Sequence, residues 1–116
     1  MMQSRFTHTK EERNGVAVFI LKGSLDIATV SNMRSDIEAV IAAGHRKILF
    51  DLDDLEQIDS SGIGAIIALF KKVRSNRGDV KISRLRGQPK EIFSLLRLDR
   101  VFEMYDDFDK ALTSFQ

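Results

Sequence analysis

The hydrophobic pattern at the start of the chain predicts a hairpin followed by a helix. Residues 16–21 (VAVFIL) are apolar at every position, which is typical of a strand buried on both faces. Asn14-Gly15 directly before them is a tight-turn signal, so we expect residues 6–12 to form a strand that folds back on this one. Apolar side chains then recur at spacings of three, four and seven, which predicts one helical stripe that ends at Gly44. The stripe consists of Val30, Met33, Ile37, Val40 and Ile41.

The middle of the chain repeats this alternation. Residues 47–52 (KILFDL) predict a second buried strand, and residues 53–59 predict an acidic loop after it. A second helix is expected to start near Ser61 and to end before Gly78. Its core-facing positions are Ile63, Ile66, Ile67, Phe70 and Val73.

The last third predicts two further strands and two further helices. A short strand is expected at residues 80–83 and a final one at residues 101–105. Pro89 suits the first turn of the helix between them. We expect its buried face to be Ile92, Phe93, Leu95 and Leu96. Asp106 or Asp107 is expected to cap a closing helix that carries Phe108, Ala111, Leu112 and Phe115.

This order of elements predicts an α/β fold. Alternating strands and helices of these lengths form a mixed, mostly parallel sheet, here of about five strands with about four α-helices. No linker or internal repeat divides residues 1–116, so we expect a single domain. Partners and ligands of such sheets meet the loops beyond the carboxyl ends of the strands, which directs attention to residues 53–64.

Composition removes several classes of function. The chain has 18 basic and 17 acidic residues and no cysteine, so disulfides and thiolate metal sites are excluded. Residues 71–100 carry ten basic against three acidic residues, yet few aromatic residues interleave with them, and we expect no nucleic-acid partner. The longest apolar run is far shorter than a membrane span. We therefore expect a cytoplasmic protein without a membrane partner, a cofactor or a metal.

The most informative stretch is Ile58-Asp59-Ser60-Ser61-Gly62-Ile63-Gly64. Ser60 or Ser61 is expected to cap the following helix, although Ile63 and Gly64 stand where a capping box has Glu or Gln. Each glycine in a first turn costs about 1 kcal/mol relative to alanine, which indicates a helix end selected for access rather than for stability alone. A phosphate on the exposed serine would lie at the positive end of the helix dipole and would add about −1.5 to −2 of charge beside Asp59.

Enzymatic motifs are incomplete. The Gly62-Ile63-Gly64 sequence has Ile67 where a dinucleotide fingerprint has its third glycine. Ser60 has Ile58 rather than glycine two residues before it, so half of a nucleophile elbow is missing. His8 and His45 are the two imidazoles in the sequence, and His45 is expected in a turn. We therefore expect no enzymatic activity.

The carboxylates of residues 51–59 raise two further hypotheses. Their spacing lacks the glycine and the terminal glutamate of an EF-hand loop, so a solvated acidic loop is favoured over a calcium site. Asp51, at the end of a buried strand, is similar to the acyl-phosphate acceptor of response-regulator receivers. That family has an acidic pair after its first strand and a lysine after its last, where this chain has Lys22-Gly23-Ser24 and Tyr105-Asp106-Asp107. A degenerate receiver phosphorylated on Asp51 stays the second hypothesis.

Four features together resemble the STAS domain of bacterial anti-sigma factor antagonists. They are the Gly23-Ser24-Leu25-Asp26 turn, the LxDLxxIDSSGIG run from Leu52 to Gly64, Gly78 before a short strand, and the pattern from Pro89 to Ala111. The resemblance covers nearly the whole chain. It implies the STAS fold, a sheet with an added amino-terminal strand and about four helices.

The resemblance also implies a function. Members of that family are small proteins without enzymatic activity that bind a serine-kinase anti-sigma factor of the GHKL fold and so free the sigma factor. Phosphorylation of the first serine of the DSSG motif blocks binding, and a PP2C-type phosphatase reverses it. Carried over, Ser60 is the phosphoacceptor. The expected partner-binding residues are Asp26, Ile58, Asp59, Ser60, Ser61, Gly62, Ile63 and Gly64. Related STAS proteins control secretion, biofilm formation or lipid transport, and these outputs stay open as alternatives.

Overall fold

A computed structural model describes residues 7–116 and contains one five-stranded sheet with the strand order β1-β2-β3-β4-β5. β1 pairs antiparallel with β2, and the other neighbours pair in parallel. The elements are β1 (Thr7–Arg13), β2 (Val16–Leu25), α1 (Val30–Ala42), β3 (Lys47–Ile58), α2 (Ser60–Ser75), β4 (Asp79–Ser83), α3 (Gly87–Leu95), a 3-10 turn (Leu98–Arg100), β5 (Glu103–Tyr105) and α4 (Phe108–Thr113). The predicted α/β class, with five strands and four helices, is confirmed.

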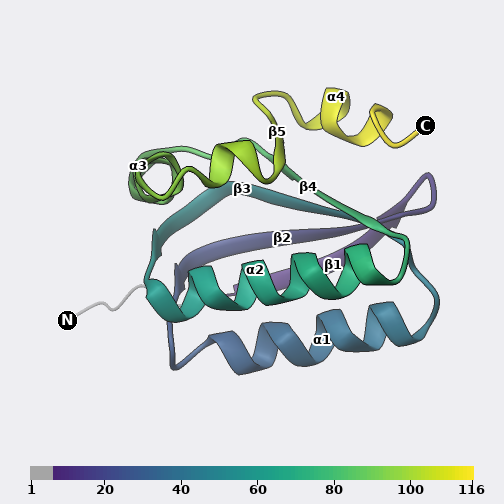
Figure 1. The fold of residues 1–116 in the computed structure, drawn as a ribbon, viewed down its shortest axis with the longest axis horizontal. Helices are drawn as coiled ribbons and strands as arrows, with labels where there is room; N and C mark the ends of the chain where they lie inside the picture. The colour runs from purple at the N-terminus through teal and green to yellow at the C-terminus, as the bar shows by residue number, and fades with distance from the viewer. Residues whose placement is uncertain (1–6) are drawn as a thin grey trace.

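Helices cover both faces of the sheet, as the apolar run of β2 predicts. Figure 1 shows α1 and α2 side by side along one face and α4 on the other side. Phe19 of β2 belongs to the core that includes Met33 of α1 and Ile66 of α2. Val18, which points to the opposite face, packs with Ala111 of α4. Within residues 7–116, no helix combines the length and the apolar character that a membrane crossing requires.

The amino-terminal hairpin is confirmed. Asn14 and Gly15 both have positive φ angles, 54° and 80°, which is the geometry that a tight two-residue hairpin turn requires. Arg13 pairs with Val16 across the turn, and the pairing continues to Thr7 opposite Lys22. Position 6, which the sequence pattern assigns to this strand, lies outside the described residues.

The predicted acidic loop at residues 53–59 is wrong, because β3 continues as a strand to Ile58. Its extension pairs with the end of β2 up to Leu25 opposite Ile58. Register shifts interrupt this pairing after Ile20 and after Gly23, so apolar residues three apart can share one face. Leu52, Leu55 and Ile58 are all buried in the core. Because buried and exposed residues do not alternate strictly in this part of β3, its sequence pattern resembles that of a loop.

Helix α3 buries less than its sequence predicts. Phe93 is fully buried, but Leu95 is 76% exposed and Leu96 is 50% exposed, so the expected inward face of the last two leucines is wrong. The helix ends at Leu95, a 3-10 turn follows at Leu98–Arg100, and β5 begins at Glu103 rather than at residue 101. β5 is accordingly shorter than predicted. Asp107, one of the two predicted caps, begins α4 by accepting a hydrogen bond from the Lys110 N–H at 3.0 Å.

Candidate functional site

Helix α2 begins at Ser60, and Asp59 caps it. The Asp59 carboxylate accepts a hydrogen bond from the Gly62 N–H at 2.9 Å, so the prediction that Ser60 or Ser61 caps this helix is wrong. Ser60 is exposed and Ser61 is half-buried. Within the described part of the chain, no hydrogen bond holds the Ser60 hydroxyl. The carboxylate of Asp59 therefore caps the helix, and the Ser60 hydroxyl at the helix start is free for other chemistry.

The two glycines of the first turn have different roles. A Cβ on Gly62 would lie 2.7 Å from both the Leu25 carbonyl oxygen and Ile58 Cγ1, so this buried glycine lets α2 pack tightly on the strand ends. The interpretation of Gly62 as a residue that keeps the helix end open is wrong for that reason. Gly64 is exposed, and a Cβ there would meet nothing within 4 Å. Gly64 alone of the pair leaves room for an approaching molecule.

Strand ends and turns bring the predicted residues together. The Asp59 N–H donates to the Leu25 carbonyl at 3.2 Å, which ties the end of β3 to the end of β2. Asp26 shapes the turn that follows β2, because its Oδ1 accepts hydrogen bonds from the N–H groups of Ala28 and Thr29 at 2.9 and 3.2 Å. This Asx-type turn places Asp26 beside the start of α2.

A groove of about 790 Å³ opens at this place, and we call it the Ser60 groove. Of the predicted site residues, Asp26, Ile58, Asp59, Ser60, Ile63 and Gly64 line it. Its other wall comes from α3, through Gln88, Ile92 and Leu96, and the sequence pattern predicts none of these three as site residues. Leu96 is half exposed in the structure, but the sequence pattern assigned it to the core, and this wall was therefore not predicted. The groove combines an apolar wall with two carboxylates and an exposed hydroxyl, which suits a protein partner.

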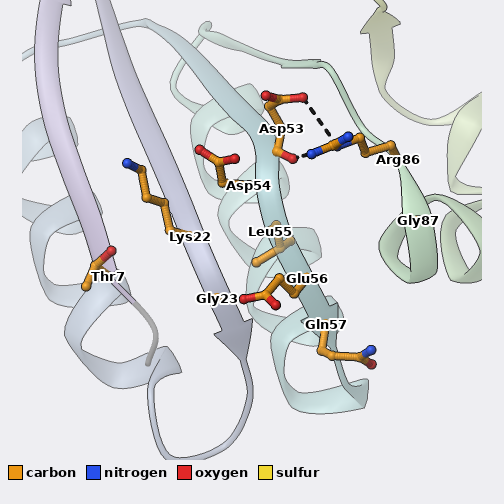
Figure 2. Close-up of a pocket in the computed structure, with 10 residues that line it drawn as sticks. All are labelled: Thr7, Lys22, Gly23, Asp53, Asp54, Leu55, Glu56, Gln57, Arg86 and Gly87. Carbon is orange, nitrogen blue, oxygen red and sulfur yellow. Dashed lines mark hydrogen bonds and ion pairs between the residues drawn. The ribbon is translucent and has the colours of Figure 1, made fainter. Parts of the chain in front are cut away.

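A second hollow, of about 940 Å³, lies along the outer face of β3. Figure 2 shows that Lys22, Asp54 and Glu56 line it. It also shows Arg86 reaching Asp53, where Arg86 Nε donates to the Asp53 carbonyl at 2.8 Å and lies 3.3 Å from Asp53 Oδ1. Among residues 7–116, no group of three His, Asp or Glu side chains gathers closely enough to hold a metal ion.

The candidates for an acyl-phosphate acceptor or a catalytic base, Asp51, His8 and His45, lie outside the Ser60 groove. Asp51 is 3% exposed, and Arg84 binds both of its carboxylate oxygens, which weighs against an acyl-phosphate acceptor there. His8 contacts Asp36 of α1, and His45 lies in the turn after α1, with its N–H on the Val40 carbonyl at 3.2 Å. Neither imidazole lines the Ser60 groove.

Comparisons with known proteins identify the family of this chain. Residues 8–111 match the STAS domain model. The anti-sigma-F factor antagonist RsfB of Mycobacterium tuberculosis is 28% identical over 92% of this chain and 87% of its own length. The crystal structure of an anti-sigma factor antagonist from Mycobacterium paratuberculosis superposes with a TM-score of 0.85 at 26% identity, covering 95% of this chain and 93% of that one. Bacillus SpoIIAA in its phosphorylated form has a TM-score of 0.78 at 20% identity, covering 95% and 100%. The chain therefore belongs to the STAS domain family, among relatives that are anti-sigma factor antagonists.

Proposed function

We propose that this protein is an anti-sigma factor antagonist whose docking is gated by phosphorylation of Ser60. Without phosphate, it binds a serine-kinase anti-sigma factor of the GHKL fold, and the kinase ends the interaction by phosphorylating Ser60. A PP2C-type phosphatase restores binding. One observation carries the proposal: the Ser60 hydroxyl is exposed and unbonded at the rim of a groove, while Asp59 performs the capping that a serine would otherwise do.

The position of Ser60 explains how a phosphate would change binding and leave the fold intact. Ser60 is the first residue of α2, where free backbone N–H groups and the helix dipole favour a negative charge. The Asp59 cap does not involve the Ser60 side chain, so the modification breaks no hydrogen bond of the folded state. The added charge of about −2 would lie beside the carboxylates of Asp59 and Asp26. A partner that fits the unmodified groove then meets a strongly acidic surface.

The groove has the character of a docking surface in its unmodified state. Leu96 and Ile92 supply apolar area next to Ser60, and exposed apolar surface rimmed by polar groups is typical of a protein interaction site. Gly64 leaves open space one helical turn from Ser60, so the backbone of a partner can approach closely. Ile58 is part of this surface, and Ser61 and the buried Gly62 would support it next to Ser60. Bacillus SpoIIAA shares this fold in a phosphorylated form, which supports a fold that tolerates the modification.

The test requires the kinase itself. Protein carrying Ser60→Ala serves as bait in the native cell extract, and the recovered GHKL-fold kinase is then purified and incubated with wild-type protein and ATP. We expect mass spectrometry to find phosphate on Ser60, and Ser61→Ala to be modified as wild type is. Ser60→Ala should bind the kinase without being released by ATP, whereas Ser60→Asp should bind weakly with an unchanged melting temperature. Phosphate found on other residues, with Ser60 unmodified, would contradict the proposal.

The Ser60→Ala bait also identifies which process this protein regulates. A sigma factor that competes with this protein for the purified kinase supports the antagonist role. A kinase that instead partners a component of secretion, biofilm formation or lipid transport assigns the chain to another STAS output.

A further inference from the structure

The last part of β3 has a free edge. β4 pairs with β3 only as far as Asp51 opposite Ser83, whereas β3 runs on to Ile58. Beyond Asp51, the side of β3 that faces away from β2 therefore has no strand neighbour within residues 7–116. Backbone N–H and C=O groups on such an edge need other partners.

Two side chains from the segment before and within α3 take the place of the missing strand. Arg86 donates to the Asp53 carbonyl at 2.8 Å, as Figure 2 shows. Gln88 forms two hydrogen bonds with one residue: its Oε1 accepts from the Ile58 N–H at 2.9 Å, and its Nε2 donates to the Ile58 carbonyl at 3.0 Å. A primary amide thus repeats the donor and acceptor pattern of a strand residue. We call this pair of bonds the Gln88 clamp.

The Gln88 clamp joins the two walls of the Ser60 groove. Ile58 lies two residues before Ser60, and Gln88 lies in the first turn of α3, one turn before Ile92. The apolar contacts of α3 come from Phe93, which is fully buried and lies 6.0 Å from Phe102 between ring centroids, from the buried Pro89, and from Ile92, which packs against the core. These apolar contacts are non-directional, whereas the two hydrogen bonds of the Gln88 clamp fix the start of α3 relative to the end of β3.

We infer that Gln88 is a positioning residue for Ser60, which holds the β3 end and α3 in the arrangement that the kinase recognises. This inference rests on the proposed function. Without the clamp, the arrangement of the β3 end and α3 becomes one conformer among several. The apparent affinity of the kinase for this protein then falls in proportion to the fraction of molecules that still adopt that arrangement. The reaction at the Ser60 hydroxyl, once docked, is unchanged. Loss of Gln88 therefore raises KM for this protein roughly three- to tenfold and leaves kcat unaltered.

The chain offers closely matched variants. Gln88→Ala removes both hydrogen bonds of the clamp. Gln88→Glu keeps the size and the acceptor, but it loses the donor and turns a carboxylate oxygen toward the Ile58 carbonyl. Arg86→Ala is the control, because it also deletes a bond to the β3 edge from the same segment but lies outside the Ser60 groove. Circular dichroism and thermal melting verify that each variant is folded.

Two measurements decide the inference. Hydrogen exchange on the protein alone should show the Ile58 N–H exchanging on the order of tenfold faster in Gln88→Ala than in wild type or Arg86→Ala. Steady-state phosphorylation by the purified kinase recovered with the Ser60→Ala bait should show the KM increase in both Gln88 variants and not in Arg86→Ala. An unchanged KM in both Gln88 variants, or an equal increase in Arg86→Ala, overturns the inference. Wild-type protein that takes no phosphate on Ser60 overturns the proposed function instead, and unaltered Ile58 exchange in Gln88→Ala then overturns the clamp as well.

Discussion

Arg84 covers the buried carboxylate of Asp51, with Arg84 Nε donating to Asp51 Oδ1 at 3.0 Å and Nη2 bound to Oδ2. Asp51 is 3% exposed, whereas the Arg84 side chain is 40% exposed. The hydrogen bonds to Asp51 raise the pKa of Arg84 above its usual value, and the nearby charges of Asp53 and Asp54 act in the same direction. This pair holds the end of β4 on β3 directly before the segment that leads to α3.

Removing the arginine should leave Asp51 charged and without its partner. We expect Arg84→Met to lower the free energy of unfolding by roughly 2 kcal/mol, less than the 3–5 kcal/mol typical of fully buried pairs, because Arg84 is partly exposed. The double variant Asp51→Leu with Arg84→Met should recover most of that loss, since no buried charge remains. Urea unfolding followed by circular dichroism measures both. Equal stability of wild type and Arg84→Met would show that the pair contributes nothing.

The same carboxylate tests the second hypothesis for the site of phosphorylation. Asp51→Asn removes any acyl-phosphate acceptor at this position but leaves Ser60 untouched. We expect the variant to accept phosphate from the purified kinase as wild type does, in a form that resists mild base. A base-labile phosphate on wild type that disappears in Asp51→Asn would support a receiver instead.

The glycines of the first turn of α2 should respond to alanine in opposite directions. Gly62→Ala places a Cβ 2.7 Å from the Leu25 carbonyl oxygen, which is backbone and cannot move aside cheaply. We expect it to lower the free energy of unfolding by about 1–3 kcal/mol through overpacking. Gly64→Ala meets empty space in an exposed helix and should raise stability by about 0.5–1 kcal/mol. Thermal melting of the two variants gives the comparison, and shifts of the same sign would contradict it.

The sequence predicted the parts of the fold that depend on local pattern. The Asn14-Gly15 hairpin and the apolar stripe of α1 follow from turn chemistry and from helical periodicity, and both are confirmed. The extension of β3 was missed because the bulged pairing with β2 replaces strict alternation, and such bulges depend on the partner strand. Local pattern alone therefore predicts that Ser60 lies at the start of α2. It does not predict that β3 extends to Ile58, two residues before Ser60.

The Ser60 groove could likewise be predicted only in part from local sequence pattern. Residues 58–64 are contiguous, so a sequence motif can identify them. Gln88 contacts Ile58 across thirty positions through side-chain atoms, and no local signal marks that contact. Leu95 and Leu96 look like core residues in a helical stripe, but α3 packs on the core through Pro89, Ile92 and Phe93 and leaves both leucines exposed. Tertiary packing, not periodicity, decides which apolar residues form the wall of the Ser60 groove.

Stability should depend on pH through Glu103. Hydrogen bonds from Lys81 and Tyr105, both at 3.1 Å, lower the pKa of Glu103 below its ordinary value of 4.5. Because the folded pKa lies below the unfolded one, the bonds stabilise the protein fully above the ordinary pKa of 4.5, and this stabilisation is lost as pH falls through the folded pKa. Glu103→Gln should cost less than about 1 kcal/mol at pH 7, since Glu103 is largely exposed. Chemical unfolding at a series of pH values should show this difference closing as pH falls below the ordinary pKa of glutamate, and a constant difference would contradict the assignment.

The two exposed leucines at the end of α3 allow the docking surface to be tested with a matched pair. Leu96 lines the Ser60 groove, whereas Leu95 lines a different hollow, together with Lys90 and Ser94. Because both side chains are at least half exposed, aspartate at either position should leave the melting temperature nearly unchanged. We expect Leu96→Asp to weaken binding of the purified kinase about tenfold or more, because the interface would bury an unpaired charge in place of an apolar side chain, and Leu95→Asp to change it less than about threefold. Titration calorimetry with unphosphorylated protein measures both. Equal weakening by the two variants would mean that the partner covers the outer face of α3 as well, and that the Ser60 groove is not the boundary of the interface.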